Sequence, residues 1–559
     1  MVENNFKLKT LPYKRVTIED FLKEGKALLK EFKEAQSGEE QFEVHKKYYE
    51  LYKKMYTTEV LVTLRRDGDV SDKFYEEEKN YYDEISPKVT AFENEYKKEL
   101  VNSKYRGYLE DKIGKIAFKD IEFALKSFDD SIIELAQEEN TLVSEYTKLM
   151  AEVKVDFKGE SLNLSLLGKY ATDKDRNIRI EAITKRSEAL EKIEDKLDDI
   201  YDKLVKNRTE QAKKLGYKNY VELGYYRMER TTYGIEEVRN FRDQVKTYLV
   251  PFTSKINEER RKRLGVEKLD SVDEGVYFKE GNPAPIGSAD DIFAAGKKMY
   301  SELSPETKEF FDFMLDHELF DVLGRKNKAG GGYMDMLFTY KAPIIFANFN
   351  GTSGDIDVIT HESGHAFQGF ITRNYEIMEH NDIKAETAEI HSMSMEFFTE
   401  KWMELFFGDR ADEYRKMHLE DAILFIPYGC MVDEFQEIVY SKPELTKDER
   451  RQVWKDLEKQ YKPYLRFEHD EFEGEGRRWQ RQHHIYSLPF YYIDYCLAQT
   501  CALQFKIKMD EDYNDAWKKY LAFSLESAKD SFKNMLHNVG LKSPFEDGYM
   551  EELIKKLDK

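Results

Sequence analysis

Apolar residues recur at helical spacing along most of this chain, and few residues interrupt the pattern. The segment IEDFLKEGKALLKEFKEA, for example, places its large apolar side chains along one stripe of a helix. Proline occurs only 12 times and glycine 29 times in 559 residues, so long helices are seldom broken. We therefore predict a mainly α fold, with amphipathic packing helices from Thr17 to about Met150, from Asp175 past Thr231, and through the last third of the chain.

Three breaks in this pattern indicate how the chain is organised. Apolar and polar residues alternate on either side of the letters KGE, which predicts a short β-hairpin between Val153 and Leu167. A looser stretch with glycine and proline follows at 265–287. A glycine-dense turn at 324–335 then leads into the apolar run APIIFANFNGT, which is typical of a loop that enters a strand. We predict a helical N-terminal lobe at residues 1–170 and a second region at residues 171–559.

The charge balance and the cysteine content exclude several classes of protein. Lys+Arg 88 against Asp+Glu 109 gives a formal net charge of −21, which argues against nucleic acid and anionic membranes as partners. The 3 cysteines are too few for a disulfide framework and lack CxxC spacing, so a reducing cytoplasm is expected. The opening residues MVENNFKLKT have no apolar stretch of a secretory signal, and the apolar run AILFIPYGCMV is about half as long as a membrane span, so neither feature is expected.

His361, Glu362 and His365 form an HExxH pattern, written HESGH in this chain. Side chains four residues apart lie on one face of a helix, so the two imidazoles can bind one Zn²⁺. Glu362 could then accept a proton from water during attack on a carbonyl carbon and pass it to the leaving amine. Apolar residues flank the motif, which predicts a largely buried helix where unpaired charges are costly. His317 begins a similar segment, but Asp321 stands where the second histidine is needed, so that segment makes no site.

A catalytic zinc usually has a third protein ligand and keeps one position open. The segment KAETAEIHSMSMEFFTE offers Glu386, Glu389 and Glu396, which can project from one face of a second helix toward the first. One of these carboxylates could bind the metal while another orients a ligand imidazole. The residues alone leave that choice open.

Polar residues near these glutamates are expected to have structural roles. His391 lies on a different side of the second helix from Glu389, so we predict a hydrogen-bonded neighbour and not a ligand. Glu400 and Glu404 are expected on an acidic, solvated face.

The segment RRWQRQHHIYSLPFYYIDY, residues 477–495, combines cations, two adjacent histidines and four tyrosines. Tyrosine hydroxyl and histidine N–H groups can donate hydrogen bonds to the oxyanion that forms when a peptide bond is attacked. The alternative is an aromatic core segment, because with 37 tyrosines in the chain most must be structural. The segment is a candidate for catalysis only together with the metal site.

HESGHAFQ, AEIHSMSMEFF and HHIYSLPFYYIDY occur in this order, and together they resemble the thimet oligopeptidase and oligoendopeptidase F family of zinc metallopeptidases. The similarity is greatest to its bacterial oligoendopeptidase F and Pz-peptidase branch. It extends over roughly Asp175 to Gly540 and includes GGGYMD and PIIFANFNGT. Three ordered motifs are far more specific than HExxH alone.

The resemblance implies a large two-lobed helical body with a deep substrate cleft, a small β-sheet near the active-site helix, and one Zn²⁺ per chain. Residues 171–559 then form the catalytic metallopeptidase region. In this family the glutamate of an E-x-x-S-x-x-x-E pattern is the third ligand, and this choice outranks Glu386. The implied site consists of the metal ligands His361, His365 and Glu389, the general base Glu362, and Ser392 and Glu396, which complete the pattern.

The resemblance also implies transition-state donors and a substrate class. A histidine and a tyrosine that stabilise the oxyanion fall on His483 and Tyr495, and a further tyrosine falls on Tyr486. The family cleaves oligopeptides and not folded proteins. An extended peptide is expected to lie along PIIFANFNG by strand addition, with its side chains largely unread.

The leading hypothesis is thus a cytoplasmic zinc endopeptidase acting on short peptides. A metallocarboxypeptidase or a dipeptidyl-releasing peptidase could use the same zinc site, with Arg477, Arg478 or Arg481 gripping the terminal carboxylate of the substrate. A different class is a non-catalytic helical scaffold that binds peptides. The sequence leaves the oligomeric state open.

Overall fold

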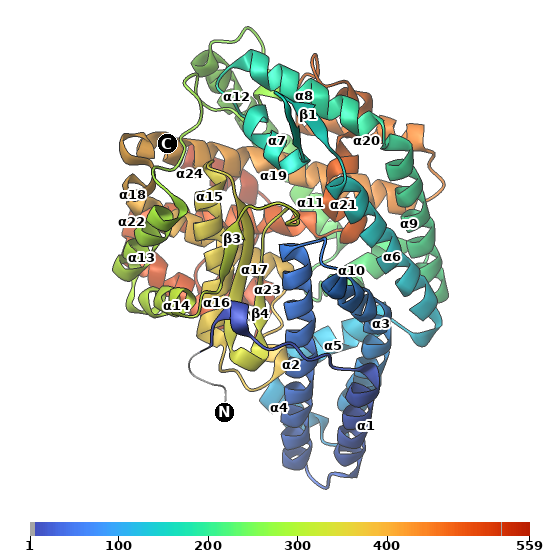
Figure 1. The fold of residues 1–559 in the computed structure, drawn as a ribbon. Helices are drawn as coiled ribbons and strands as arrows, with labels where there is room; N and C mark the ends of the chain where they lie inside the picture. Colours follow the sequence, from blue (N-terminus) through green and yellow to red (C-terminus); the bar gives the residue numbers. More distant parts are fainter. Residues whose placement is uncertain (1–5, 527, 559) are drawn as a thin grey trace.

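The structure is a computed structural model that describes residues 6–526 and 528–558. Helices make up most of this part of the chain, and its strands form two small sheets, one of which packs beside the helix of the HExxH motif (Figure 1). The predicted mainly α fold is therefore confirmed. Among the described residues, no helix is both long enough and apolar enough to cross a membrane.

The N-terminal helices pack around a hydrophobic core of their own. The first two helices start as the sequence leads one to expect, because the side chains of Thr17 and Ser37 each accept a backbone N–H from the first turn. Ile377, far along the chain, joins this core. A division of the chain at residue 170 stays a prediction. These helices are α1 (Ile18–Glu34), α2 (Gly38–Gly68), α3 (Lys73–Val101), α4 (Arg106–Ile113) and α5 (Lys115–Ser127).

The predicted hairpin is present. Strand β1 (Val155–Phe157) pairs antiparallel with β2 (Glu160–Leu162), and Gly159 makes the turn with a φ of 83°. The hairpin is shorter than predicted because a helix already begins at Leu164. The helices around it are α6 (Ile133–Ala151), α7 (Leu164–Ala171), α8 (Arg176–Glu191), α9 (Glu194–Lys214) and α10 (Tyr220–Arg227).

The second sheet has three strands in the order β3–β5–β4. The predicted strand forms β5 (Ala342–Phe349), which pairs parallel with β3 (Phe320–Leu323) and antiparallel with β4 (Tyr333–Leu337). Both sides of β5 are thus occupied by other strands. The expected addition of a peptide along this strand is wrong, since only β3 and β4 have an outer edge.

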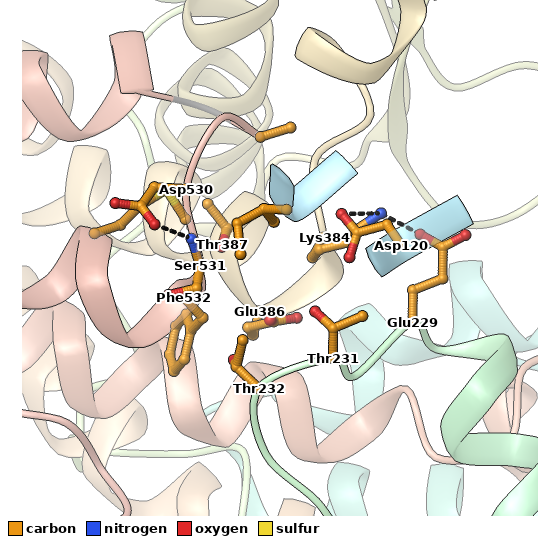
Figure 2. Close-up of a pocket in the computed structure, with 13 residues that line it drawn as sticks. Asp120, Glu229, Thr231, Thr232, Lys384, Glu386, Thr387, Asp530, Ser531 and Phe532 are labelled. Atoms are coloured by element: carbon orange, nitrogen blue, oxygen red, sulfur yellow. Dashed lines mark hydrogen bonds and ion pairs between the residues drawn. The ribbon is translucent and has the colours of Figure 1, made fainter. Parts of the chain in front are cut away.

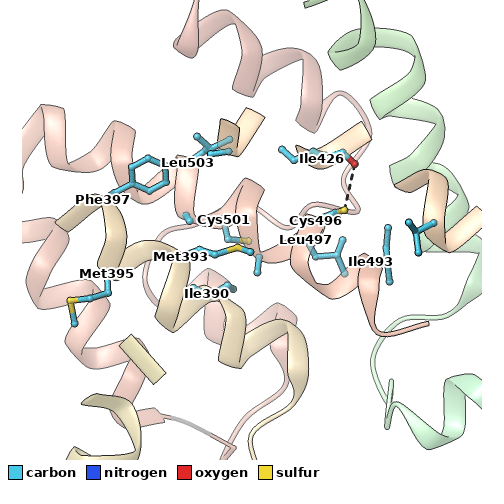
Figure 3. Packing of buried hydrophobic residues seen from close by; sticks show 14 of the residues in the cluster. Ile390, Met393, Met395, Phe397, Ile426, Ile493, Cys496, Leu497, Cys501 and Leu503 are labelled. Carbon is cyan, nitrogen blue, oxygen red and sulfur yellow. Dashed lines mark hydrogen bonds between the residues drawn. The ribbon is translucent and has the colours of Figure 1, made fainter. Parts of the chain in front are cut away.

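The largest core lies among the helices that carry the second half of the chain. Ile390 and Met393 of α17 pack with Leu497 and Cys501 of α22 (Figure 3). Burial of such side chains stabilises the fold by about 1.5–3 kcal/mol each and fixes the position of α17. The helices of this half are α11 (Ile235–Gln244), α12 (Val250–Leu264), α13 (Ala289–Leu303), α14 (Pro305–Asp316), α15 (Gly354–Asp357), α16 (Ser363–Thr372), α17 (Ala385–Phe398), α18 (Glu404–Phe407), α19 (Ala411–Ser441), α20 (Lys447–Tyr461), α21 (His483–Ser487), α22 (Tyr492–Glu526), α23 (Phe532–Asn538) and α24 (Tyr549–Leu557).

Helices α19 and α22 approach each other closely at Gly429. A Cβ atom there would lie 2.2 Å from Sγ of Cys496, so no larger residue fits without movement. The thiol of Cys496 donates a hydrogen bond to the carbonyl oxygen of Ile426 at 3.5 Å. This contact holds α22, which carries Tyr495, against α19.

Candidate active site

The HExxH residues lie where a π-helical turn meets an α-helix. Residues Val358–Glu362 form the π turn, and α16 begins at Ser363. Ile359, Ala366 and Phe367 are fully buried, so the predicted buried helix is confirmed. The π turn was not predicted, and such turns within helices are frequent at functional sites.

Helices α16 and α17 touch at Gly364, inside the HExxH motif. A Cβ atom at this position would lie 2.6 Å from Cα of Ser392 and 2.8 Å from the carbonyl oxygen of His391. Because both neighbours are backbone atoms, a larger residue would push the two helices apart. The glycine thus sets the separation from which Glu389 of α17 reaches the histidines of the motif.

Glu389 meets the two histidines at one point. Its Oε2 atom lies 3.5 Å from Nε2 of His361 and 3.5 Å from Nε2 of His365. The imidazole rings are nearly perpendicular, at 84°, with centroids 5.1 Å apart. Possible ligand atoms of the three residues all lie within 4.8 Å of one another, and among the described residues they form the one His, Cys, Asp or Glu group that could hold a metal ion.

A second carboxylate orients His361 from behind. Nδ1 of His361 lies 2.6 Å from Oε1 of Glu396, which leaves Nε2 of the same ring facing Glu389. The other oxygen of Glu396 lies 2.5 Å from Nε2 of His418. A carboxylate on the far nitrogen of a metal-binding histidine fixes the tautomer and the ring orientation, and this is the arrangement seen here.

In the part of the chain that the structure describes, imidazoles balance the charge of Glu389 and Glu396. Burial would raise the pKa of Glu389, but His365 and His361 hold that pKa well below its usual range. In the same way the histidines outweigh burial and lower the pKa of Glu396 to about 2. Burial raises the pKa of Glu362. In the described part of the chain no lysine or arginine forms an ion pair with any of these glutamates.

Glu386, the other candidate ligand, lies elsewhere. It lines a small hollow near the start of α17 together with Asp120, Glu229 and Lys384 (Figure 2). Lys384 forms an ion pair with Glu229, and burial raises the pKa of Glu386 to about 8. Glu386 is not part of the group that could hold a metal, so the preference for Glu389 agrees with the geometry.

His484, and not the predicted His483, lines a cavity of about 350 Å³ beside His361. His483 is exposed, and its ring faces Tyr146 with centroids 5.7 Å apart. Adjacent residues of a helix point in directions about 100° apart, so only one of the two rings can face the cavity. Tyr495 lines the same cavity, as its predicted role requires.

Tyr486 is a core residue, and the structure does not bring it to the cavity. Its side chain is fully buried, its ring stacks on Tyr146 at 3.9 Å, and its hydroxyl donates to the carbonyl oxygen of Leu197 at 3.2 Å. The predicted catalytic role is wrong because that hydroxyl is already bonded away from the site. Tyr491, which sequence reasoning missed, donates to Oε1 of Glu389 at 2.6 Å. The four-residue spacing of tyrosines within YYIDY was the available signal.

The structure places three neighbouring polar residues. His391 does not belong to the group that could hold a metal, as predicted; it is 1% exposed, packs against Phe523, and its Nε2 atom has no hydrogen-bond partner in the described chain. Glu400 is buried and lies 3.5 Å from the ammonium of Lys506, so it is not on a solvated face. Glu404 is exposed, as predicted.

The arginines of the 477–481 segment are not free to grip a substrate carboxylate. Each already forms an ion pair with a carboxylate of the protein. This removes the feature that favoured a carboxypeptidase or a dipeptidyl-releasing peptidase. The pairs are Arg477 with Glu194 at 2.9 Å, Arg478 with Glu274 at 2.6 Å and Arg481 with Glu473 at 2.6 Å.

A helical fold that brings two histidines of an HExxH helix and a glutamate of a second helix together defines a metallopeptidase. The profile of peptidase family M3 matches residues 169–281 and 306–553, and that of the peptidase M3 N-terminal domain matches residues 8–128. The chain belongs to peptidase family M3. The comparison with curated proteins gave no match.

Solved structures agree with this assignment over the whole chain. A protein assigned as oligoendopeptidase F, from crystals grown by microfluidic seeding, is 45% identical, with 99% of this chain and 98% of that chain covered and a TM-score of 0.97. Pz peptidase A with an inhibitor gives the same identity, coverage and TM-score. A protein assigned as oligoendopeptidase F from Bacillus anthracis str. Ames is 43% identical, with coverage of 100% and 98% and a TM-score of 0.92.

Proposed function

We propose that this metallopeptidase binds one Zn²⁺ per chain through His361, His365 and Glu389 and hydrolyses short oligopeptides at internal peptide bonds. The observation that carries the proposal is the convergence of three ligand atoms within 4.8 Å of one another. Similarity to oligoendopeptidase F and to Pz peptidase A supports oligopeptides as the substrate class.

The residues present suit a catalytic zinc ion. Two imidazoles and one carboxylate are a common ligand set of catalytic zinc, and three protein ligands leave a position open for water or substrate. Magnesium and calcium prefer sites made of oxygen atoms alone. Among the described residues, Glu389 and Glu396 have no lysine or arginine partner, so a divalent cation would supply a permanent positive charge.

The protein residues can carry out each proton transfer that hydrolysis needs. When bound, the metal would supply a Lewis acid that polarises the substrate carbonyl and lowers the pKa of water. The carboxylate of Glu362 accepts a proton from the attacking water as the water oxygen bonds to the carbonyl carbon. It then donates that proton to the amine nitrogen as the C–N bond breaks. His484 and Tyr495 line the cavity, from which each can donate a hydrogen bond to the carbonyl oxygen as it gains negative charge.

Glu362→Gln tests this assignment. We expect kcat to fall by about 10²- to 10⁴-fold, because glutamine cannot accept and return a proton. Zinc content and the free energy of unfolding should stay at the wild-type values, measured by elemental analysis and urea denaturation. Glu404→Gln, at an exposed site, is the control and should be fully active. A Glu362→Gln protein that cleaves peptides at the wild-type rate would remove the mechanism.

End-blocked peptides separate internal cleavage from cleavage at a terminus. An internally quenched peptide with acetylated and amidated ends should be hydrolysed as fast as the same peptide with free ends. Mass spectrometry of the products then locates the bond. If only free-ended peptides are cleaved, the enzyme depends on a terminus and is not an endopeptidase.

The cytoplasm is the compartment that we propose. All three cysteines are free and buried, which suits a reducing environment where thiols persist. The formal net charge of −21 supports peptides, and not nucleic acid, as partners. Cell fractionation followed by immunodetection would test the location.

A further inference from the structure

The cavity beside His361 is lined by two aspartates, and no lysine or arginine is among its lining residues in the described part of the chain. Asp357 and Asp421 both line it. Asp357 accepts a hydrogen bond from the hydroxyl of Tyr414 at 2.9 Å, and Asp421 accepts one from Tyr277 at 2.6 Å. In the described part of the chain neither aspartate forms an ion pair, and neither belongs to the group that could hold a metal ion.

Gln499 adds an independent sign that a ligand belongs in this cavity. The residue lines the cavity, is only 5% exposed, and its Nε2 atom has no hydrogen-bond partner within the described chain. A buried amide without a partner costs about 1–3 kcal/mol, so such groups are rare in a folded protein unless they serve a bound molecule. Rotation of the amide can present either its N–H or its carbonyl oxygen to that molecule.

Aromatic and aliphatic side chains also line the cavity. Phe425, Tyr492 and Tyr495 are among them, and the ring of Phe425 is tilted by 51° to that of Tyr492, with centroids 5.6 Å apart. Such walls suit an apolar stem, and aromatic faces attract a cation. The imidazoles of His361, His418 and His484 also line the cavity, and those of His361 and His418 already lie between carboxylates.

We propose that this cavity is the subsite for a peptide side chain next to the scissile bond, and that it takes a long cationic side chain, arginine or lysine. The inference rests on the proposed function, because it assumes that His361 holds the metal at which the bond is cleaved. An arginine would place its stem between the aromatic rings and its guanidinium against Asp357, Asp421 and the oxygen of Gln499. An acidic side chain would be repelled, and an uncharged one would leave the aspartates unpaired.

Matched peptides test the charge requirement directly. Internally quenched, end-blocked peptides would carry arginine or its uncharged isostere citrulline at each of the two positions that flank the scissile bond, with the bond located by mass spectrometry. At one of these positions we expect kcat/KM to be about ten- to a hundredfold higher for arginine, the range of a charged hydrogen bond. A peptide with glutamate at that position should have a lower kcat/KM than the citrulline peptide.

Variants of α19 link this preference to the cavity. Asp421→Asn should bring the arginine-to-citrulline ratio toward one. Asp412→Asn is the matched control, because Asp412 lies on the same helix with a side chain that is 96% exposed and outside the cavity. It should leave the ratio unchanged. Circular dichroism and the melting temperature would show that both variants fold.

Binding separates failure of this inference from failure of the proposed function. Fluorescence anisotropy with the Glu362→Gln protein measures the Kd of the same labelled peptides without turnover. A ratio of one at both positions, in turnover and in binding, overturns the inference and leaves the peptidase proposal intact. If no peptide is cleaved by the wild-type enzyme, the proposed function fails, and the Kd ratio alone then decides whether the cavity selects a cation.

Discussion

Among the regions of this protein that shield carboxylates from solvent, two balance the negative charge in opposite ways. Between α6, α9 and α10, Glu139 accepts hydrogen bonds from Arg208 at 2.6 Å and from Arg227 at 3.0 Å. Between α16 and α17, every ion pair of Glu389 and Glu396 within the described residues is with an imidazole. The first region carries its own permanent cations, and the described part of the second has none.

The difference separates a structural cluster from a functional one. Arginine stays protonated at every pH at which proteins fold, so the charge of Glu139 is always neutralised. The two arginines outweigh the effect of burial and lower the pKa of Glu139 to about 2. Arg208 also donates to the carbonyl oxygen of Tyr486, so this cluster supports the segment that carries His484. An imidazole, unlike a guanidinium, can release its proton, and the neutral ring can then bind a metal.

Metal removal should cause the largest loss of activity, and it should act through the second region alone. A chelator should abolish peptide hydrolysis, because the cavity then lacks its Lewis acid, and added Zn²⁺ should restore it. When the free Zn²⁺ concentration is about 100 times the Kd, the free energy of unfolding should rise by about 2.7 kcal/mol. Activity assays and thermal unfolding with and without metal measure both effects. Full activity in a protein shown to be metal-free would contradict the proposed site.

Glu139→Gln should have the largest effect on stability. Loss of one member of a buried ion pair leaves Arg208 without its carboxylate partner and costs about 3–5 kcal/mol. Urea denaturation of the metal-free protein measures the loss. Zinc affinity, measured by competition with a chromophoric chelator, should stay the same. A variant as stable as wild type would show that the arginine cluster is not structural.

Glu396→Gln makes the same substitution as Glu139→Gln, but in the second region. The carboxylate that orients His361 is lost, so zinc affinity should fall by about 10- to 100-fold. The metal-free protein should lose far less stability than Glu139→Gln does, because no arginine is left unpaired. Urea denaturation of the metal-free protein and zinc competition with a chromophoric chelator measure the two effects. If both glutamine variants lose equal stability and equal zinc affinity, the two regions do not differ as argued.

A pH dependence should give the smallest effect. The pKa of Glu139 is about 2 in the folded protein, below its ordinary value of 4.5, so its contribution to stability is complete above pH 4.5 and is lost as the pH falls toward 2. The difference in unfolding free energy between wild type and Glu139→Gln should therefore be constant from about pH 5 to about pH 8. It should shrink by pH 3. A difference that grows as the pH falls would reverse the sign and reject the ion pair.

Local patterns predicted the helices and the strand β5, and helical spacing placed His361 and His365 on one face. Glu389 was selected by the family resemblance and not by spacing, and the structure brings it close to the two histidines. The sequence did not reveal which of His483 and His484 faces the cavity. That depends on the start of the short helix α21 and on the ring of Tyr146, which occupies the other side. Tyr486 was misassigned for the same reason.

Burial of charged residues was equally hard to predict. Glutamate is usually an exposed residue type. Helices α19 and α22 nevertheless cover Glu400 and bring His418 and Lys506 within ion-pair distance of it. Such contacts join residues far apart in the chain, and no local spacing encodes them. The position of β5 between β3 and β4 likewise depends on contacts that no local spacing encodes.

The sequence by itself determined the helical class, the buried motif helix and the chemistry available to it, because periodicity and ligand type are local properties of a chain. Tertiary structure decided which side chains meet. Gly364 lets α17 come close enough for Glu389 to reach the histidines, and the packing of α19 and α22 encloses the cavity lined by Asp421 and Gln499. These distances follow from the packing of whole helices, in which every neighbour takes part.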